Sequence, residues 1–245
     1  MKAAGKVSIA LCFFIFVLAI FAYAEEGKSV KTKTNFPPPT ATNPGAPTAT
    51  PMIPPGATPA IMVWSGEKTT LDNLQTAFNG ESNAHARYLV FAQKAGAEGY
   101  GKVANLFRAA ARAEEVHFKR CAKVIKELGG VPTAKIEPAI EKSTAENLET
   151  AMKSEIYEST IMYPEFWAQS EKDQIKGATD AFEDIGKAEA VHAGLYEKAR
   201  ENLPEWKDKS KKFEVCTFCG NVVEKVNFKN CPVCGKSKKL YVSVR

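Results

Sequence analysis

The chain has few of the residues that would mark an extreme class of protein. It has only three histidines among 245 residues, and its 33 Lys and Arg against 28 Asp and Glu leave a formal net charge of +5. A mild charge of interspersed sign gives no indication of nucleic-acid binding. With 44% hydrophobic residues, the chain is long enough to bury a sizeable core and to hold more than one domain.

The apolar run near the N-terminus favours a cleaved signal peptide over a permanent membrane anchor. Residues 9–24 are sixteen uninterrupted apolar residues, which span roughly 24 Å as a helix at about 1.5 Å each, against about 30 Å of hydrocarbon. Lys2 and Lys6 precede the run, and Ala22-Tyr23-Ala24 ends it as a small-x-small cleavage site. No Arg-Arg precedes it, which favours export of an unfolded chain. We therefore expect residues 1–24 to be a signal peptide and the mature protein to be periplasmic, or membrane-tethered if cleavage fails.

Residues 25–63 are expected to form a linker. Nine of the chain's 14 prolines fall between Pro37 and Pro59, interleaved with Thr, Ala and Gly. Such a stretch cannot bury enough apolar surface to fold, and it will be extended and semi-rigid. Either a spacer that holds the folded part away from a membrane or partner, or a tolerated disordered leader, fits this composition.

Two segments of the chain contain the same short sequence motif, which we call the repeated motif. Residues 107–117 read F-R-A-A-A-R-A-E-E-V-H, and residues 182–192 read F-E-D-I-G-K-A-E-A-V-H. In each copy of the motif a Glu and a His stand three residues apart, so both side chains lie on one face of a helix. Two of the chain's three histidines are used in this way. The candidate ligands are Glu114, His117, Glu189 and His192.

Each copy of the repeated motif is preceded by a further glutamate, one helix upstream and at nearly the same spacing. Glu81 lies 33 residues before Glu114, and Glu155 lies 34 before Glu189. Glu81 also follows an apolar stripe of helical spacing, and a carboxylate on a core-facing stripe needs a partner. Four helices that supply Glu, Glu-x-x-His, Glu and Glu-x-x-His are the ligand set of a di-iron site in a four-helix bundle.

The pattern predicts a mainly α-helical chain with a small cysteine-rich end. We expect helices over residues 70–97, 101–128, 143–172 and 174–202, with 129–142 as a crossover between the two helix pairs. Gly129-Gly130-Val131-Pro132 ends the second helix, and Ser143-Thr144-Ala145-Glu146 is a capping box that starts the third. Short hairpins should follow from Phe213, with residues 240–244 as a closing strand.

The C-terminal part contains a second motif typical of metal binding. Two C-x-x-C turns are separated by eleven residues, and four thiolates suit a tetrahedral zinc or a single iron. Spacing alone does not distinguish the two metals, and a purely structural zinc ribbon stays open as an alternative. The expected ligands are Cys216, Cys219, Cys231 and Cys234.

Together these motifs resemble the rubrerythrin family. The resemblance covers the chain from about Trp64 to its end and predicts a ferritin-like four-helix bundle at residues 64–205, followed by a small rubredoxin-like four-cysteine domain at 206–245. Glu158, three residues after Glu155, resembles rubrerythrins and not ferritins. The matching runs are Ala77–Tyr88, Ala113–His117, Glu155–Phe166 and Ala188–His192.

The resemblance also implies a role for each ligand. Glu114 and Glu189 would bridge two irons, Glu81 and Glu155 would be terminal, and His192 would hold one iron. The other iron would exchange His117 for Glu158 between the reduced and oxidised states. Tyr88 and Tyr163 are similar to tyrosines near the di-iron site, although from the sequence alone they could be ordinary core residues.

The resemblance implies a peroxidase that reduces hydrogen peroxide to water, with one iron in the four-cysteine site passing electrons from a donor protein to the di-iron centre. In the family, the four-cysteine site approaches the di-iron site of a neighbouring subunit, so a head-to-tail homodimer is expected. The alternative is a ferritin-type iron-oxidising or iron-binding protein with a structural zinc ribbon, since storage requires no dedicated electron inlet.

Three nearby side chains are not expected to bind metal. His85 lies outside the repeated motif and should have a polar supporting or surface role. Glu115 points about 100° away from Glu114 on the helix and should be solvated. Cys121 is expected to be a buried thiol.

Overall fold

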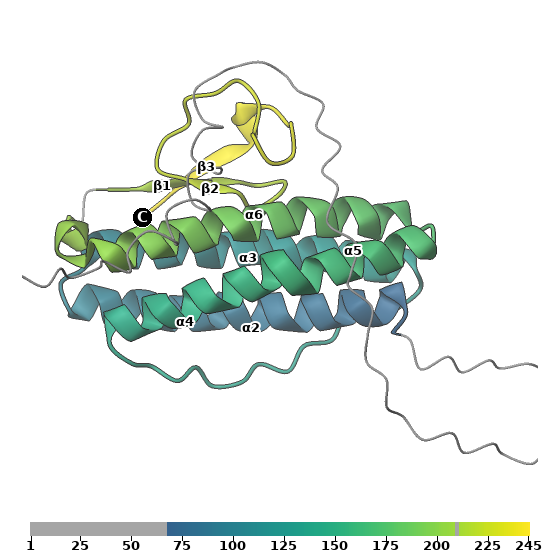
Figure 1. The fold of residues 1–245 in the computed structure, drawn as a ribbon, viewed down its shortest axis with the longest axis horizontal. Helices are drawn as coiled ribbons and strands as arrows, with labels where there is room; N and C mark the ends of the chain where they lie inside the picture. Colours follow the sequence, from purple (N-terminus) through teal and green to yellow (C-terminus); the bar gives the residue numbers. More distant parts are fainter. Residues whose placement is uncertain (1–67, 209–210) are drawn as a thin grey trace, which may run out of the picture. The chain divides into compact units, whose positions relative to one another are not determined.

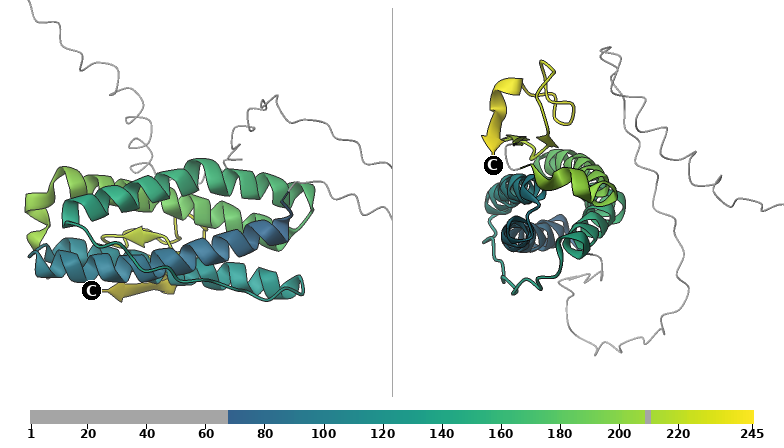
Figure 2. Two further views of the ribbon diagram at one scale, coloured as in Figure 1. Left: turned by 90° about the horizontal axis from the view of Figure 1, so that it is seen from below. Right: turned by 90° about the vertical axis from the view of Figure 1, so that its left-hand side faces the viewer.

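The structure is a computed structural model that describes residues 68–208 and 211–245. The expected signal peptide and linker lie outside the described residues. Within the described part, a bundle of long helices carries a small three-stranded sheet on one side (Figures 1 and 2). None of the described helices is both long and apolar enough to cross a bilayer. The bundle consists of α2 (Thr70–Ala97), α3 (Gly101–Glu127), α4 (Thr144–Tyr157), the π-helix η1 (Glu158–Met162), α5 (Tyr163–Lys172) and α6 (Lys176–Glu201).

The helix boundaries follow from local sequence. Thr69 and Asp72 form a capping box at the start of α2, and Ser143 with Glu146 forms the predicted one at α4. Gly99 has φ +84° in the tight turn between α2 and α3, a conformation that only glycine adopts without strain. The predicted helix limits at residues 70–97 agree with α2, and those of α3 and α6 agree to within two residues.

The third helix runs without a break from residue 144 to 172, as predicted, but it is not regular throughout. Its middle turn, η1, widens to the π form, in which the Tyr163 N–H donates to the Glu158 carbonyl five residues earlier. Pro164 has no N–H to continue the regular pattern. The Ser159 hydroxyl donates to the Glu155 carbonyl at 2.7 Å, next to the wide turn. Single-turn π segments are frequent at functional sites.

The crossover between the helix pairs runs without regular structure along the face of the bundle opposite the sheet (Figures 1 and 2). Two asparagines of α2 hold it in place. Asn79 Oδ1 accepts from the Lys135 N–H at 2.8 Å, and Asn83 Oδ1 accepts from the Glu137 N–H at 2.8 Å. These side chains satisfy backbone groups that a long connection would otherwise leave unpaired.

The C-terminal sheet packs on the bundle through apolar side chains. It has the order β2-β1-β3 and is antiparallel throughout. The 3₁₀ segment η2 (Leu203–Lys207) places Trp206 against Phe213, with ring centroids 6.2 Å apart, in one core with Phe107 and Tyr196. The predicted closing strand begins one residue later than expected, because Leu240 belongs to the 3₁₀ turn η3 (Lys238–Leu240). The strands are β1 (Phe213–Cys216), β2 (Val222–Val223) and β3 (Tyr241–Val244).

Two separate apolar clusters fill the bundle, and a polar layer lies between them. In α2, Leu74 and Ala77 belong to one cluster, whereas Ala84, Tyr88 and Phe91 belong to the other. Glu81 stands between the two groups along the helix. The same alternation recurs on α3, α4–α5 and α6, so apolar side chains cover the polar layer above and below and exclude bulk water from it.

Candidate metal centres

Six of the predicted ligands meet in this polar layer, and each is at most 1% exposed. Their ligand atoms form two overlapping groups in which all atoms lie within 4.8 Å of one another. Glu114 and Glu189 are common to both groups, which is the arrangement that two metal ions sharing two bridging carboxylates require. The first group is Glu81, Glu114, His117 and Glu189, and the second is Glu114, Glu155, Glu189 and His192.

The unpaired atoms of this layer fit metal ions. Buried polar atoms normally have a hydrogen-bond partner. Here the carboxylate oxygens of the layer include several without one, and His192 Nδ1 also has none although it lies 2.7 Å from Glu189 Oε2. Acceptor atoms that converge in a buried layer can be neutralised by bound cations. The unpaired atoms are Glu81 Oε2, Glu114 Oε1, Glu155 Oε2, both Glu189 oxygens and His192 Nδ1.

Both imidazoles have the same orientation, which fixes the role of each ring nitrogen. His117 Nδ1 faces Glu114 Oε2 at 2.7 Å, and its Nε2 donates to the Cys219 carbonyl at 3.0 Å. His192 Nδ1 faces the carboxylates, and its Nε2 donates to the Gly220 carbonyl at 3.1 Å. Because a carbonyl can only accept, Nε2 of each ring carries a proton, and Nδ1 is the atom available to bind a metal.

The electrostatics of the layer oppose its folding without cations. Burial raises the pKa of Glu81, Glu114 and Glu189 well above the usual value, and repulsion from neighbouring carboxylates adds to the effect. Burial acts in the same direction on Glu155, but the His192 imidazole, whose Nδ1 lies 3.7 Å from Glu155 Oε2, outweighs it and lowers the pKa of this carboxyl. Bound cations would replace this repulsion by attraction.

Two tyrosines support the terminal carboxylates, as the resemblance implied. The Tyr88 hydroxyl donates to Glu155 Oε1 at 2.6 Å, and the Tyr163 hydroxyl donates to Glu81 Oε1. Both rings are fully buried, and burial raises the pKa of each phenol well above its usual value. The two hydroxyls therefore stay protonated and act as hydrogen-bond donors.

Glu158 lies in η1, outside both metal groups, although it is only 8% exposed. Burial raises the pKa of its carboxyl well above the usual value, and repulsion from Glu81 and Glu155 adds to this. The Ser154 hydroxyl donates to its Oε1 at 3.5 Å. In this structure His117 thus occupies the place beside Glu114, and Glu158 is held nearby.

The other three residues considered from the sequence belong to none of the groups of ligand atoms. His85 Nδ1 donates to the Ala111 carbonyl at 2.7 Å, and His85 belongs to neither metal group. Glu115 is partly exposed and pairs with Arg112 and Lys119. Cys121 is fully buried, and burial raises the pKa of its thiol.

The four cysteines form a separate group whose sulfur atoms lie within 4.8 Å of one another. Two of the Sγ–Sγ distances are 3.9 Å (Cys216–Cys234) and 3.6 Å (Cys219–Cys231). A tetrahedron with metal–sulfur bonds of about 2.3 Å has edges of about 3.8 Å. The Tyr241 hydroxyl donates to Cys231 Sγ at 3.0 Å. The group therefore fits one tetrahedral metal ion.

Sequence reasoning missed how closely the two centres approach within one chain. The carbonyls of Cys219 and Gly220 accept from both ligand imidazoles, so the first C-x-x-C turn lies directly on the di-metal layer. Gly220 has φ +79°, and a Cβ there would lie 2.1 Å from His117 Nε2. The glycine after the first turn is visible in the sequence, but an equivalent glycine, Gly235, follows the second turn.

Tyr196 was also missed. Its ring is fully buried 5.7 Å from that of Tyr88, and its hydroxyl has no hydrogen-bond partner among the described residues. It stands four residues after His192, which places it on the same helix face, and this spacing could have indicated it.

Comparison with known proteins agrees with this geometry. The rubrerythrin family model matches residues 72–200. The chain belongs to the rubrerythrin family. It is 33% identical over 184 residues to nigerythrin of Nitratidesulfovibrio vulgaris, covering 71% of this chain and 86% of that protein. It is also 33% identical over 172 residues to rubrerythrin-2 of Clostridium acetobutylicum, covering 69% and 93%.

Solved structures of the family confirm the fold. Nigerythrin in its fully reduced, all-ferrous state superposes with a TM-score of 0.67 at 28% identity, over 81% of this chain and 99% of that one. A bacterioferritin of Mycobacterium tuberculosis, 20% identical with a TM-score of 0.51, shares the bundle fold over 56% of this chain and 86% of its own. The predicted ferritin-like bundle with a four-cysteine domain is therefore confirmed. As a rubrerythrin, the chain has a di-iron centre and a four-cysteine site for one metal, in a family whose members are generally oxidoreductases.

Replacing Gly220 should loosen the contact between the two centres. Gly220→Ala and Gly235→Ala both place a side chain at positive φ, but only the first meets a neighbour within 4 Å. Gly220→Ala should lose the two carbonyl–imidazole hydrogen bonds, at about 1 kcal/mol each. Amide hydrogen exchange over residues 216–222 should then be roughly thirtyfold faster than in Gly235→Ala. Equal exchange in the two variants would contradict the close approach.

Proposed function

We propose that the chain is an exported di-iron peroxidase that reduces hydrogen peroxide to water, with electrons supplied through an iron in the four-cysteine site. The observation that carries the proposal is the pair of hydrogen bonds from His117 and His192 to the carbonyls of Cys219 and Gly220. A storage protein has no need of a second metal site held against the ligands of the first.

The two overlapping groups support the proposed ligand roles. Glu114 and Glu189 would be shared by the two metals, while Glu81 and Glu155 would each hold one. His117 and His192 would bind through Nδ1, because their Nε2 atoms are committed to the four-cysteine turn. When bound, two ferrous ions supply the two electrons that cleave the O–O bond of peroxide. Tyr88 and Tyr163 hold the terminal carboxylates in orientation and keep their own protons within the dry layer.

Glu158 is proposed to exchange with His117 as a ligand when the metal pair is oxidised. Support comes from its burial beside the carboxylates without a place in either group, which is unfavourable unless the carboxyl is neutral or finds a cation. The wide turn of η1 carries it, and such a turn tolerates local rearrangement more easily than a regular helix does.

The electron path is proposed to run from the four-cysteine metal through the Cys219–Gly220 backbone to the imidazoles. Cys219 supplies both a metal-binding sulfur and the carbonyl that His117 contacts. This favours iron over zinc in the four-cysteine site, because zinc does not change its oxidation state. The alternative function, a ferritin-type iron-oxidising or iron-binding protein with a structural zinc ribbon, gives this contact no role.

The cysteine site decides between the two functions. Cys219→Ser should abolish repeated peroxide reduction driven by a donor protein, because the inlet is lost. The pre-reduced variant should still consume one peroxide per di-iron site. Cys121→Ser, which changes a buried cysteine outside the four-cysteine site, is the matched control and should turn over. If Cys219→Ser sustains turnover at the rate of the control, the four-cysteine site is not the inlet.

Glu158→Ala tests the proposed ligand exchange. The variant should retain two ferrous ions, because Glu158 belongs to neither group in this structure. Its oxidation by peroxide should slow by about 10–100-fold, the usual effect of removing a group that supports a metal site. Stopped-flow absorbance measures the rate, with the exposed Glu165→Ala as control. An unchanged oxidation rate would remove Glu158 from the mechanism.

Export is proposed from the N-terminal sequence. If residues 1–24 are cleaved, mass spectrometry of the periplasmic fraction of the native host should find a mature chain that begins at Glu25. A full-length chain in the cytosol would contradict export, and a full-length chain in the membrane would contradict only cleavage. Since NADH is not expected outside the cytoplasm, the donor is proposed to be an exported or membrane-linked carrier.

A head-to-tail homodimer also remains a proposal. Within one chain the four-cysteine turn already contacts its own His117 and His192, so the electron path does not by itself require a neighbouring subunit. Sedimentation equilibrium of the metal-loaded protein tests assembly, and a single species of monomer mass at micromolar concentration would contradict the dimer.

A further inference from the structure

The four-cysteine domain differs from the bundle in charge. Residues 206–245 contain ten Lys and Arg and three Asp and Glu, a net charge of +7, whereas residues 64–205 contain 18 and 23, a net charge of −5. Clustered charge of one sign in a small domain favours binding of a partner of the opposite sign. The proposed peroxidase function does not account for this asymmetry.

Four of the lysines surround the second C-x-x-C turn, and we call them the lysine patch. Backbone pairing brings the two flanks of the turn together: the Lys238 N–H donates to the Lys229 carbonyl at 3.0 Å, and the Cys231 N–H donates to the Lys236 carbonyl at 2.7 Å. All four side chains are exposed, and none forms an ion pair with another described residue. The patch consists of Lys229, Lys236, Lys238 and Lys239.

The patch lies around the most accessible cysteine of the metal site. Cys234 is partly exposed, next to the exposed Pro232, whereas Cys216 and Cys219 are fully buried. The first C-x-x-C turn is not accessible to an external protein, because its carbonyls contact the ligand imidazoles of the bundle. An external donor can therefore approach the metal from the second turn, and the metal can pass electrons on through the first.

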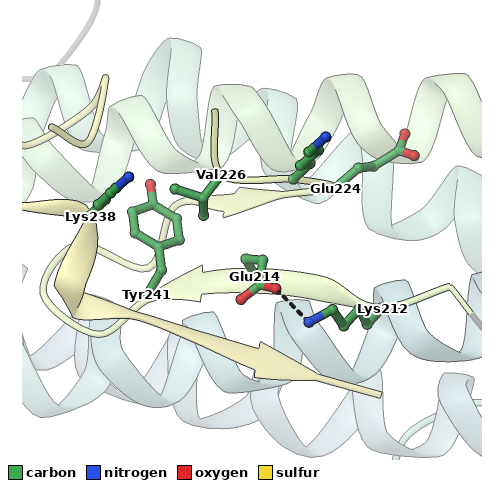
Figure 3. A pocket seen from close by; sticks show the side chains of 7 residues that line it. Lys212, Glu214, Glu224, Val226, Lys238 and Tyr241 are labelled. Atoms are coloured by element: carbon green, nitrogen blue, oxygen red, sulfur yellow. Dashed lines mark ion pairs between the residues drawn. The ribbon is translucent and has the colours of Figure 1, made fainter. Parts of the chain in front are cut away.

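An open pocket of about 560 Å³ extends this surface beside Lys238 (Figure 3). Its two carboxylates are already paired, Glu214 with Lys212 at 3.1 Å and Glu224 with Lys198 at 2.6 Å. Lys225 and Lys238 also line it, and neither forms an ion pair within the described residues. The pocket thus adds positive charge to the patch. Tyr241 in its wall donates to Cys231 Sγ, which links the pocket to the metal site.

We propose that the lysine patch is the docking surface for an acidic one-electron carrier protein, which reduces the four-cysteine site at its Cys234 side. This inference rests on the proposed use of that site as the electron inlet. One electron passes from the reduced carrier to a ferric four-cysteine iron, which becomes ferrous, and no bond is made or broken. Charge complementarity mainly raises the association rate, which suits a brief encounter between redox proteins.

The test compares two triple variants of equal net charge. Lys229→Glu/Lys238→Glu/Lys239→Glu reverses the patch, and Lys123→Glu/Lys135→Glu/Lys153→Glu reverses three bundle lysines whose side chains are 76%, 85% and 68% exposed. The probe is a reduced plant-type ferredoxin chosen for a strongly negative net charge. Stopped-flow absorbance follows reduction of the four-cysteine iron, and calorimetry with the oxidised ferredoxin measures binding whichever metal is present.

At low ionic strength the patch variant should be reduced at least about tenfold more slowly than wild type, and the control less than about twofold. The difference should shrink at about 0.5 M salt, where exposed charges are screened. Dithionite should reduce both variants equally, which shows that the metal site is intact. Peroxide turnover with dithionite tests the proposed function separately, because it bypasses the patch.

Three results would overturn the docking proposal. The first is equal reduction rates and equal ferredoxin binding in the two triple variants. The second is unchanged ferredoxin kinetics in the patch variant together with lost binding to vesicles of anionic lipid, which would assign the patch to a membrane surface. The third is unchanged ferredoxin kinetics together with dissociation of a dimer, which would assign the patch to a second copy of this chain.

Discussion

The structure depends on mutual repulsion among buried carboxylates. Glu81, Glu114, Glu155 and Glu189 lie with Glu158 in one layer between two apolar clusters, with His117 and His192 among them. Burial and repulsion raise the pKa of most of these carboxyls, so the layer is unfavourable until cations bind. Four helices are held at this spacing by the apolar clusters, and the metal pair is the group that makes the arrangement stable.

The same layer determines where the four-cysteine domain can sit. Each ligand imidazole uses Nδ1 toward the carboxylates and has one N–H left, and the Cys219 and Gly220 carbonyls accept these two protons. Gly220 allows the approach because it has no Cβ. Trp206 and Phe213 pack the sheet onto the bundle beside this contact. The two metal sites are therefore connected by backbone hydrogen bonds, and the lysines around the second C-x-x-C turn stay exposed.

The helices and the ligand set could be predicted from sequence because local rules decide them. The i, i+3 spacing in each copy of the repeated motif places Glu and His on one face of a helix. The caps at Thr69 and Ser143 set where two of the helices begin. The π-turn at Glu158 could not be predicted from these local rules; in the structure it directly precedes Tyr163, which packs closely against Gly186 of another helix. The contact of the first C-x-x-C turn was equally hidden, since Gly220 and Gly235 have the same local sequence context and only tertiary structure distinguishes them.

The proposed function requires that electrons pass from the four-cysteine site to the di-iron centre during peroxide reduction. Mixing the fully reduced, iron-loaded protein with excess peroxide and following the red colour of the ferric four-cysteine site measures this transfer. The colour should develop on the timescale of peroxide consumption in wild type, and much more slowly in Glu189→Ala, which lacks a carboxylate common to both metal groups. Equally fast colour development in both proteins would show that peroxide oxidises the four-cysteine site directly, and would rule out this electron path.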